Sequence, residues 1–269
     1  MPKFAANLTM LFNELPFLER FAASAAAGFT AVEYLFPYAF PAEVLAARLR
    51  EFGLTQVLHN LPAGNWDAGE RGIAILPDRV GEFRDGVAKA IVYARTLGCG
   101  QINCLAGIAP RAVDGERLYD TFVTNLRFAA AALAAEGIKL LIEPINTRDI
   151  PGFYLSRTGQ ALELIEAVGS DNLFLQYDIY HMQIMEGDLA LTLEANLPQI
   201  AHVQLADNPG RHEPGSGEIH YPFLFNHLDR IGYAGWIGCE YKPSRTTLEG
   251  LGWYEPYAAE LLNERRAGQ

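Results

Sequence analysis

Four polar residues each end a short apolar run in the second half of the chain. They are Glu143 in KLLIE, Asp178 in LFLQYD, Gln204 in IAHVQ and Glu240 in WIGCE. If these runs are strands of one parallel barrel, the four side chains meet at the mouth formed by the strands' carboxyl ends. Oxygen atoms delivered from several strand ends are a typical way to hold a hard cation. The pattern therefore predicts a metal site, and with it an enzyme.

The charge of this group points to a divalent metal. Glu143, Asp178 and Glu240 are three carboxylates, which repel one another unless protons or a cation neutralise them. Gln204 adds a neutral carbonyl oxygen, so the ligand set contains only oxygen, which suits Mg2+ or Mn2+ better than zinc. Any one of these acids alone could equally pair with an arginine or cap a helix. It is the occurrence of all four that favours a metal.

The elements that must position these residues alternate along the whole chain. Eight short β-branched or apolar runs alternate with segments of helical period, which is typical of repeated βα units around a parallel sheet. Glycine ends several helices before the next strand, as in AAAGFTAVEY, REFGLTQV, ARTLGCGQI and AAEGIKLLIEP. The expected strands are residues 4–8, 31–35, 56–60, 101–105, 139–143, 174–178, 202–205 and 236–241, and the clearest helices are 16–27, 42–52, 80–97 and 118–136.

Length and composition fit one α/β domain. A chain of 269 residues has the length of a single (β/α)8 TIM barrel, so residues 1–269 are expected to form one domain. Mean hydropathy is +0.04, and no apolar run reaches the roughly 18 residues that a membrane span needs. The opening MPKFAANLTMLFNE lacks the apolar core and cleavage site of a secretory signal. We therefore expect a cytoplasmic protein with no membrane partner.

Charge and cysteine content exclude further classes. The formal net charge of −11 disfavours a nucleic-acid surface, because phosphate binding depends on clustered lysine and arginine. Cys99, Cys104 and Cys239 are an odd number without CxxC spacing. Neither a disulfide framework nor a zinc ribbon is therefore indicated, and the three are expected to be small buried residues.

Long motifs along nearly the whole chain resemble one known family. They are FAANLTMLFNELPFLERFAASAAAGF, VEYLFPY, NLPAGNWDAGERGIA, IEPINTRDIPGF, QYDIYHMQ, HVQLADNPGRHEPGSGEI and CEYKP. These blocks resemble the hydroxypyruvate isomerase family, including the related 2-oxo-tetronate isomerases, within the xylose isomerase-like barrel superfamily. The resemblance implies metal ligands at Glu143, Asp178, Gln204 and Glu240, and proton-transfer roles for Glu143 and Glu240.

The activity that the resemblance implies is an aldose–ketose type isomerisation of a small hydroxy-oxo acid. The expected reaction converts hydroxypyruvate to tartronate semialdehyde (2-hydroxy-3-oxopropanoate) by proton transfer between two glutamates through an enediolate, with a divalent metal, Mg2+ or Mn2+, as cofactor. A 2-oxo-tetronate is the alternative substrate, one carbon longer. Related ketose 3-epimerases usually carry His where this chain has Gln204. That difference favours the hydroxypyruvate branch.

Several residues near strand ends are candidates for binding this substrate. His181 follows the sixth-strand acid by three residues and could donate a hydrogen bond to a substrate hydroxyl, or could cap a helix. Arg211 lies in the long loop 206–221, where its guanidinium could clamp a substrate carboxylate or form a loop salt bridge. Lys242 follows Glu240 by two residues and would share its side of a continuing strand, unless it is a surface lysine.

Weaker candidates have ordinary explanations beside the functional one. Arg71 lies in the long loop 60–77 and His59 precedes it, but an isolated histidine is more often a satisfied core residue than a ligand. His202 shares a strand face with Gln204, one layer deeper, where it could support that residue. The aromatic stretch 34–40 is interpreted as a lid or as a contact within a homo-oligomer, with core packing as the alternative.

Two other classes of protein are compatible with such a barrel. Metal-dependent DNA endonucleases of the same superfamily need a three-metal cluster and a basic rim, which six histidines and a net charge of −11 do not favour. A non-catalytic binding module would have no need of two acid–base candidates beside a complete set of metal ligands. The isomerase is therefore the preferred interpretation.

Overall fold

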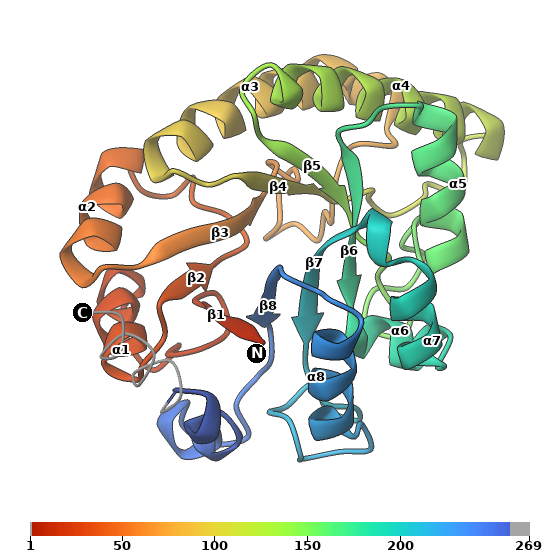
Figure 1. Cartoon of the computed structure of the whole chain (residues 1–269). Coiled ribbons are helices and arrows are strands. Elements are labelled where there is room, and N and C mark those ends of the chain that lie inside the picture. Colours follow the sequence, from red (N-terminus) through yellow and green to blue (C-terminus); the bar gives the residue numbers. More distant parts are fainter. Residues whose placement is uncertain (1, 259–269) are drawn as a thin grey trace.

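The computed structural model of the chain describes residues 2–258. Eight parallel strands form a closed barrel in chain order, and the first strand pairs with both the second and the eighth. Helices surround the barrel on the outside (Figure 1). The strands are β1 (Lys3–Asn7), β2 (Ala31–Glu33), β3 (Thr55–Asn60), β4 (Gln101–Cys104), β5 (Lys139–Ile142), β6 (Leu173–Asp178), β7 (Ile200–Leu205) and β8 (Trp236–Cys239). The predicted (β/α)8 TIM barrel is confirmed.

Helices follow most of the strands. They are α1 (Arg20–Ala26), α2 (Ala42–Phe52), α3 (Val80–Leu97), α4 (Gly115–Ala134), α5 (Thr158–Val168), α6 (Ile179–Met185), α7 (Leu189–Ala195) and α8 (Tyr221–Arg230). Four short 3-10 helices are η1 (Phe17–Glu19), η2 (Pro77–Arg79), η3 (Leu197–Gln199) and η4 (Leu248–Trp253). The helices expected at 42–52 and 80–97 have those bounds. Both end at a glycine in the left-handed conformation, Gly53 and Gly98, as the sequence predicts.

Other boundaries differ from the predicted ones for local reasons. The helix expected from residue 16 begins as η1, because Pro16 is extended at the N-cap, and α1 starts only at Arg20. The helix expected from 118 starts at Gly115, because the Asp114 carboxylate caps it by accepting from two backbone amides. The strands expected to end at residues 35 and 241 end earlier, at Glu33 and Cys239.

The core has a large outer part and a small inner part. The outer cluster packs the helices against the barrel wall through residues such as Phe83, Phe122 and Leu164. The inner cluster consists of Ala5, Ala31, Val57, Leu58 and Leu141. Ala31 and Leu141 precede Glu33 and Glu143 by two residues, so each shares a strand face with the acid above it. The barrel interior is therefore apolar at the bottom and polar towards its carboxyl end.

Cys99, Cys104 and Cys239 are buried and free, as expected for small buried residues. Among the described residues, no helix is long and apolar enough to span a membrane.

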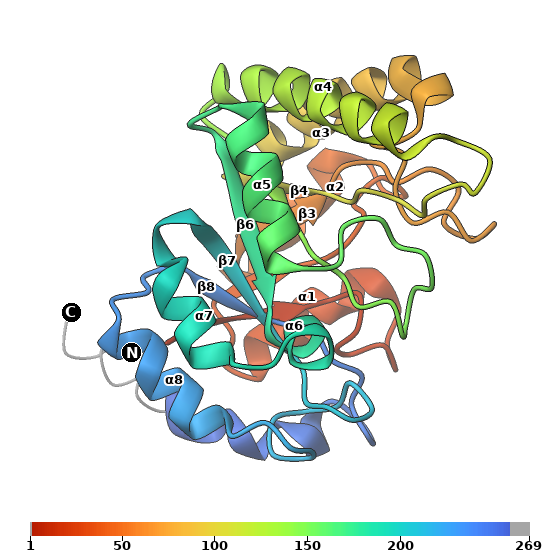
Figure 2. The same ribbon diagram turned by 90° about the vertical axis from the view of Figure 1, so that its right-hand side faces the viewer.

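The long connections after β3, β4 and β5 project on one side of the barrel, which Figure 2 shows at the right. Two of them cross backbone to backbone. Gly72 and Gly107 both have positive φ, +121° and +112°, and a Cβ on Gly72 would lie 2.4 Å from the Leu105 carbonyl oxygen. Only glycine fits this crossing, which anchors the loop carrying Arg71 over the barrel mouth.

We expect Gly72→Ala to lower the free energy of unfolding by more than about 2 kcal/mol, because it adds a backbone clash to an unfavourable φ. Gly53→Ala is the matched control, since Gly53 also has positive φ but an added Cβ would meet nothing within 4 Å. That change should cost only about 1 kcal/mol. Urea unfolding of both variants measures the difference, and equal losses would contradict the crossing as described.

Candidate active site

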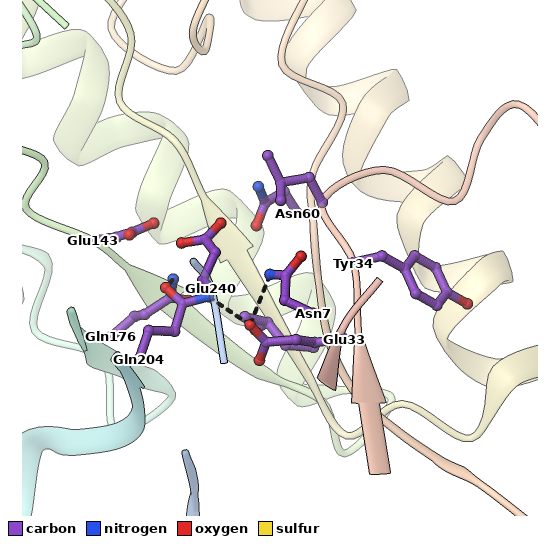
Figure 3. Close-up of a pocket in the computed structure, with 10 residues that line it drawn as sticks. Asn7, Glu33, Tyr34, Asn60, Glu143, Gln176, Gln204 and Glu240 are labelled. Carbon is purple, nitrogen blue, oxygen red and sulfur yellow. Dashed lines mark hydrogen bonds between the residues drawn. The ribbon is translucent and has the colours of Figure 1, made fainter. Parts of the chain in front are cut away.

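The carboxyl ends of β5 to β8 bring the four predicted ligands to one mouth. Glu143 and Glu240 directly follow β5 and β8, Asp178 is the last residue of β6, and Gln204 lies near the end of β7. All four are at most 6% exposed. Glu143, Gln204 and Glu240 line one cavity of about 10 Å3 (Figure 3). This volume holds one water molecule or an ion of similar size.

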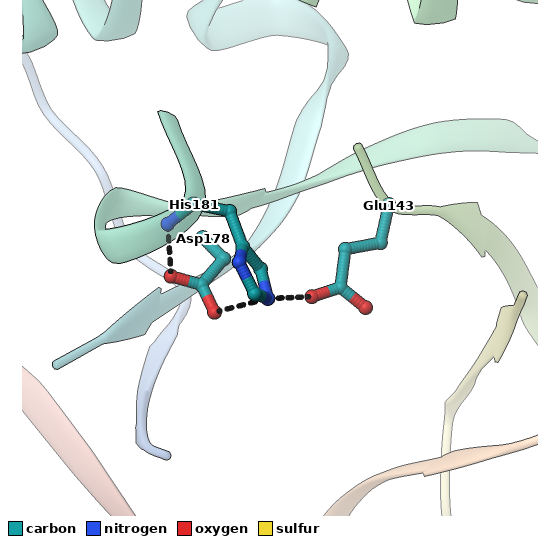
Figure 4. A group of neighbouring side chains, drawn as sticks. All are labelled: Glu143, Asp178 and His181. Atoms are coloured by element: carbon teal, nitrogen blue, oxygen red, sulfur yellow. Dashed lines mark hydrogen bonds and ion pairs between the residues drawn. The ribbon is translucent and has the colours of Figure 1, made fainter. Parts of the chain in front are cut away.

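Asp178 and His181 lie next to Glu143 (Figure 4). Asp178 Oδ1 caps α6 by accepting from the backbone amides of Tyr180 at 2.7 Å and His181 at 3.2 Å. Its Oδ2 is buried without a hydrogen bond. His181 Nε2 lies 3.6 Å from that oxygen and 3.9 Å from Glu143 Oε1. Glu143, Asp178 and His181 therefore form a group that could hold a metal ion.

The surroundings of His181 determine which of its nitrogens carries a proton. Asn146 Nδ2 lies 2.6 Å from His181 Nδ1, and an amide nitrogen can only donate. Burial, assisted by the nearby charge of Arg211, holds the pKa of His181 well below its usual value, so the ring is neutral. Its proton is then on Nε2, facing Glu143 and Asp178. His181 thus joins the α6 cap through its backbone N–H and directs its Nε2–H into the site, and it could bind a metal through Nε2 only if that proton moved to Nδ1.

Arg211 supplies the positive charge next to the acids. Its Nη2 donates to Glu240 Oε2 at 2.8 Å and lies 3.7 Å from Asp178 Oδ2. The guanidinium carbon lies 5.3 Å from the centre of the Tyr180 ring. The Arg211 backbone has a φ of +61°, a conformation that non-glycine residues rarely adopt. Arg211 thus pairs with two of the proposed ligands rather than with an acid of its own loop.

Burial raises the pKa of all three carboxyl groups, and repulsion from the other acids adds to the shift for Glu143 and Glu240. Burial raises the pKa of Glu143 well above its usual value, and the charges of Glu240 and Asp178 add to the shift. Burial also raises the pKa of Asp178. The pKa of Glu240 is raised to about 8, again mainly by burial, although Arg211 opposes the shift. One arginine does not neutralise the group.

Gln204 is held by hydrogen bonds within the barrel. Its Oε1 accepts from Gln176 Nε2 at 2.6 Å, and its Nε2 donates to Glu33 Oε1 at 2.8 Å. Glu33 is completely buried. Neither Glu33 nor Gln176 is among the residues predicted from the sequence. Glu33 follows a short apolar run as the other acids do, but the strand predicted there extends to residue 35, whereas β2 ends at Glu33.

A larger cavity of about 880 Å3 lies above these acids. Arg71, Lys242 and Arg211 line it, as do Arg148 and Asp149, which the sequence analysis did not single out. These five belong to loops that follow β3, β5, β7 and β8.

The burial of His59 favours a role in core packing over a role in substrate binding. Its side chain is completely buried, and its Nδ1 lies 3.2 Å from the Asn60 carbonyl oxygen. Burial lowers the pKa of His59 to about 4, so the ring is neutral.

The donor set fits a hard divalent cation. Three carboxylates and one amide oxygen gather at the mouth, and Asp178 Oδ2 has no hydrogen-bond partner there. Burial, together with the charges of neighbouring acids, raises the pKa values of Glu143 and Glu240. A cation bound by these oxygen atoms would remove the repulsion.

Comparisons with known proteins agree on the kind of barrel. A family model described as xylose isomerase-like TIM barrel matches residues 21–257. The chain is 55% identical over 257 residues to the hydroxypyruvate isomerase of Escherichia coli (strain K12), covering 96% of this chain and 100% of that protein. It is 51% identical over 257 residues to the 2-oxo-tetronate isomerase of Cupriavidus necator, covering 96% and 99%.

Solved structures extend the similarity to the fold. A crystal structure named AP endonuclease, family 2, from Brucella melitensis has a TM-score of 0.94 and 48% identity, and the match covers 96% of this chain and 99% of that one. An L-ribulose 3-epimerase structure has a TM-score of 0.75 and 25% identity, with 95% and 86% covered.

We expect the metal-free protein to lose stability as pH rises from about 5 to about 8. In the folded chain the pKa of Glu240 is about 8, whereas in the unfolded chain it is about 4.3. Between these values the folded state binds more protons, so the free energy of unfolding falls with rising pH. Urea unfolding in the presence of a chelator measures this decline, which Glu240→Gln should make shallower. Equal slopes for the two proteins would contradict the raised pKa.

Proposed function

The chain belongs to the hydroxypyruvate isomerase family of xylose isomerase-like TIM barrels and is an isomerase, and we propose that it is a metal-dependent isomerase of a small hydroxy-oxo acid. The proposed reaction is the interconversion of hydroxypyruvate and tartronate semialdehyde. The observation that carries the proposal is the convergence of the buried carboxylates of Glu143, Asp178 and Glu240 at one barrel mouth.

In this proposal Glu143, Asp178, Gln204 and Glu240 hold Mg2+ or Mn2+. Such a cation, when bound, supplies positive charge that stabilises an oxyanion of the substrate and acidifies the neighbouring C–H bond. The oxygen-only donor set supports these two metals over zinc.

The two glutamates are proposed to move the proton. One carboxylate takes a proton from C3 of hydroxypyruvate and the other delivers one to C2, while the hydroxyl proton of C3 passes to the former carbonyl oxygen. Burial raises the pKa of Glu143 and of Glu240 and so favours their basicity, whereas contact with a cation would lower it. Each is therefore proposed to exchange the proton through the oxygen that does not contact the cation. His181 Nε2–H, which faces the site, donates a hydrogen bond to a substrate oxygen.

The cations of the large cavity support an acidic substrate. Arg71 donates to the carbonyl oxygens of Trp66 and Glu70, and Arg148 Nη1 lies 3.4 Å from Asn208 Oδ1. Within residues 2–258, neither of these arginines nor Lys242 belongs to an ion pair. In a chain with a net charge of −11, unpaired cations gathered around one cavity favour binding of a carboxylate.

Two other activities are less well supported. A 2-oxo-tetronate would use the same groups, and the Cupriavidus necator relative carries that name, so the two acids must be compared directly. The name of the Brucella melitensis structure refers to a nuclease. In the described part of the chain, however, only one group of at least three His, Cys, Asp or Glu residues lies close enough to hold a metal. That favours an isomerase over an enzyme with three metal ions.

Replacing either glutamate tests the proton transfer. We expect Glu143→Gln and Glu240→Gln to lower turnover of hydroxypyruvate by at least about 10²-fold, because an amide cannot exchange the proton. Turnover is measured by NMR on metal-stripped protein resupplied with Mg2+ or Mn2+. Glu163→Gln, an exposed change on α5, is the matched control. Metal-independent turnover, or full activity in either variant, would refute the mechanism.

Lys242 offers a test of the acidic substrate. Lys242→Met should raise KM for hydroxypyruvate about tenfold, the equivalent of about 1.4 kcal/mol, with a smaller change in kcat. Lys89→Met, an exposed lysine on α3, should change neither constant. Steady-state kinetics with hydroxypyruvate and with a 2-oxo-tetronate also identify the preferred acid. An unchanged KM in Lys242→Met would remove this lysine from the carboxylate site.

A further inference from the structure

Glu33 is a buried carboxylate below the mouth that accepts hydrogen bonds from three side chains. Asn7 Nδ2 and Gln204 Nε2 lie 2.9 and 2.8 Å from its Oε1, and His202 Nε2 lies 2.7 Å from its Oε2. The bonds from Asn7 and Gln204 meet at Glu33 in Figure 3. Glu33 is not among the four proposed metal ligands, and it reaches across the barrel from β2 to β7.

The barrel is built to admit this side chain. A Cβ on Gly238 would lie 2.3 Å from both carboxylate oxygens of Glu33, so only glycine fits at that position of β8. His202 is itself held from below, where Gln101 Nε2 lies 3.1 Å from its Nδ1. An amide nitrogen can only donate, so the proton of His202 is on Nε2 and points at Glu33. The carboxylate is therefore fixed from several directions.

The orientation of Gln204 depends on this carboxylate. The two ends of a glutamine amide have similar shapes but opposite chemistry, and only the oxygen can bind a cation. Both oxygens of Glu33 accept hydrogen bonds in the structure, Oε1 from Asn7 and Gln204 and Oε2 from His202. The NH2 group of Gln204 must therefore face Glu33, and its oxygen faces the other way, where Gln176 donates to it.

We propose that Glu33 is a positioning residue of the metal site, which acts by holding the amide of Gln204 so that its oxygen faces the cation. This inference rests on the proposed function, because it assumes that Gln204 is a metal ligand. In a Glu33→Gln variant the new oxygen would accept from His202 and the new NH2 group would face Asn7 and Gln204. Gln204 would then turn its oxygen towards residue 33 and its NH2 group towards the cation.

The test is the affinity of metal-stripped protein for Mn2+, measured by electron paramagnetic resonance. Glu33→Gln should weaken binding by about 10- to 100-fold, the usual effect of removing a partner that orients a metal ligand. The reciprocal variant Glu33→Gln/Gln204→Glu restores a hydrogen-bond donor and acceptor between the two positions and keeps the total charge. A carboxylate at position 204 presents an oxygen to the cation in either orientation. Mn2+ affinity in this double variant should return to within about threefold of the wild-type value.

A double-mutant cycle with Gln204→Ala distinguishes loss of Gln204 orientation from a general effect of removing the Glu33 charge. Gln204→Ala removes the oriented group, so adding Glu33→Gln to it should cause no further loss of affinity. Circular dichroism and thermal unfolding confirm that each variant is folded. Wild-type affinity in Glu33→Gln, failure of the reciprocal variant to recover affinity, or a further loss in the Gln204→Ala background would overturn the positioning role. Wild-type protein that binds no Mn2+ would instead overturn the proposed metal site, and this inference with it.

Discussion

Repulsion among three buried carboxylates is the constraint on which the rest of the site depends. Glu143, Asp178 and Glu240 are almost excluded from solvent, and burial raises the pKa of each. Arg211 contacts two of them but carries a single charge. The cost of such a group must be offset, and the proposed divalent cation would offset it.

The barrel positions these acids relative to one another. β5 to β8 deliver one proposed ligand each, an apolar layer lies below them, and the loops above them carry Arg71, Arg148 and Lys242. Between the two lies a polar layer in which Gln176 and Glu33 contact Gln204, and His202 contacts Glu33. An amide ligand has one oxygen and so needs partners that orient it, whereas a carboxylate offers two equivalent oxygens. This difference is the basis of the role proposed for Glu33.

Much of this arrangement could be predicted from the sequence, because it follows from local patterns. Glycine in the left-handed conformation ends α2 and α3, so those helices were bounded correctly, and each proposed ligand closes an apolar run. What could not be predicted depends on contacts between distant segments. Glu33 meets His202 and Gln204 across the barrel, and its own strand ends two residues earlier than the apolar pattern indicated. Arg211, which pairs with Glu240, has a positive φ that no sequence motif predicts.

Anomalous diffraction from a crystal soaked in Mn2+ would show whether these acids bind a metal. We expect a manganese peak coordinated by oxygen atoms of Glu143, Asp178, Gln204 and Glu240, with the Arg211 guanidinium moved away from Glu240. Data collected above and below the manganese absorption edge would identify the ion. A fully occupied crystal with no peak at the barrel mouth, or with manganese bound only at other residues, would contradict the account.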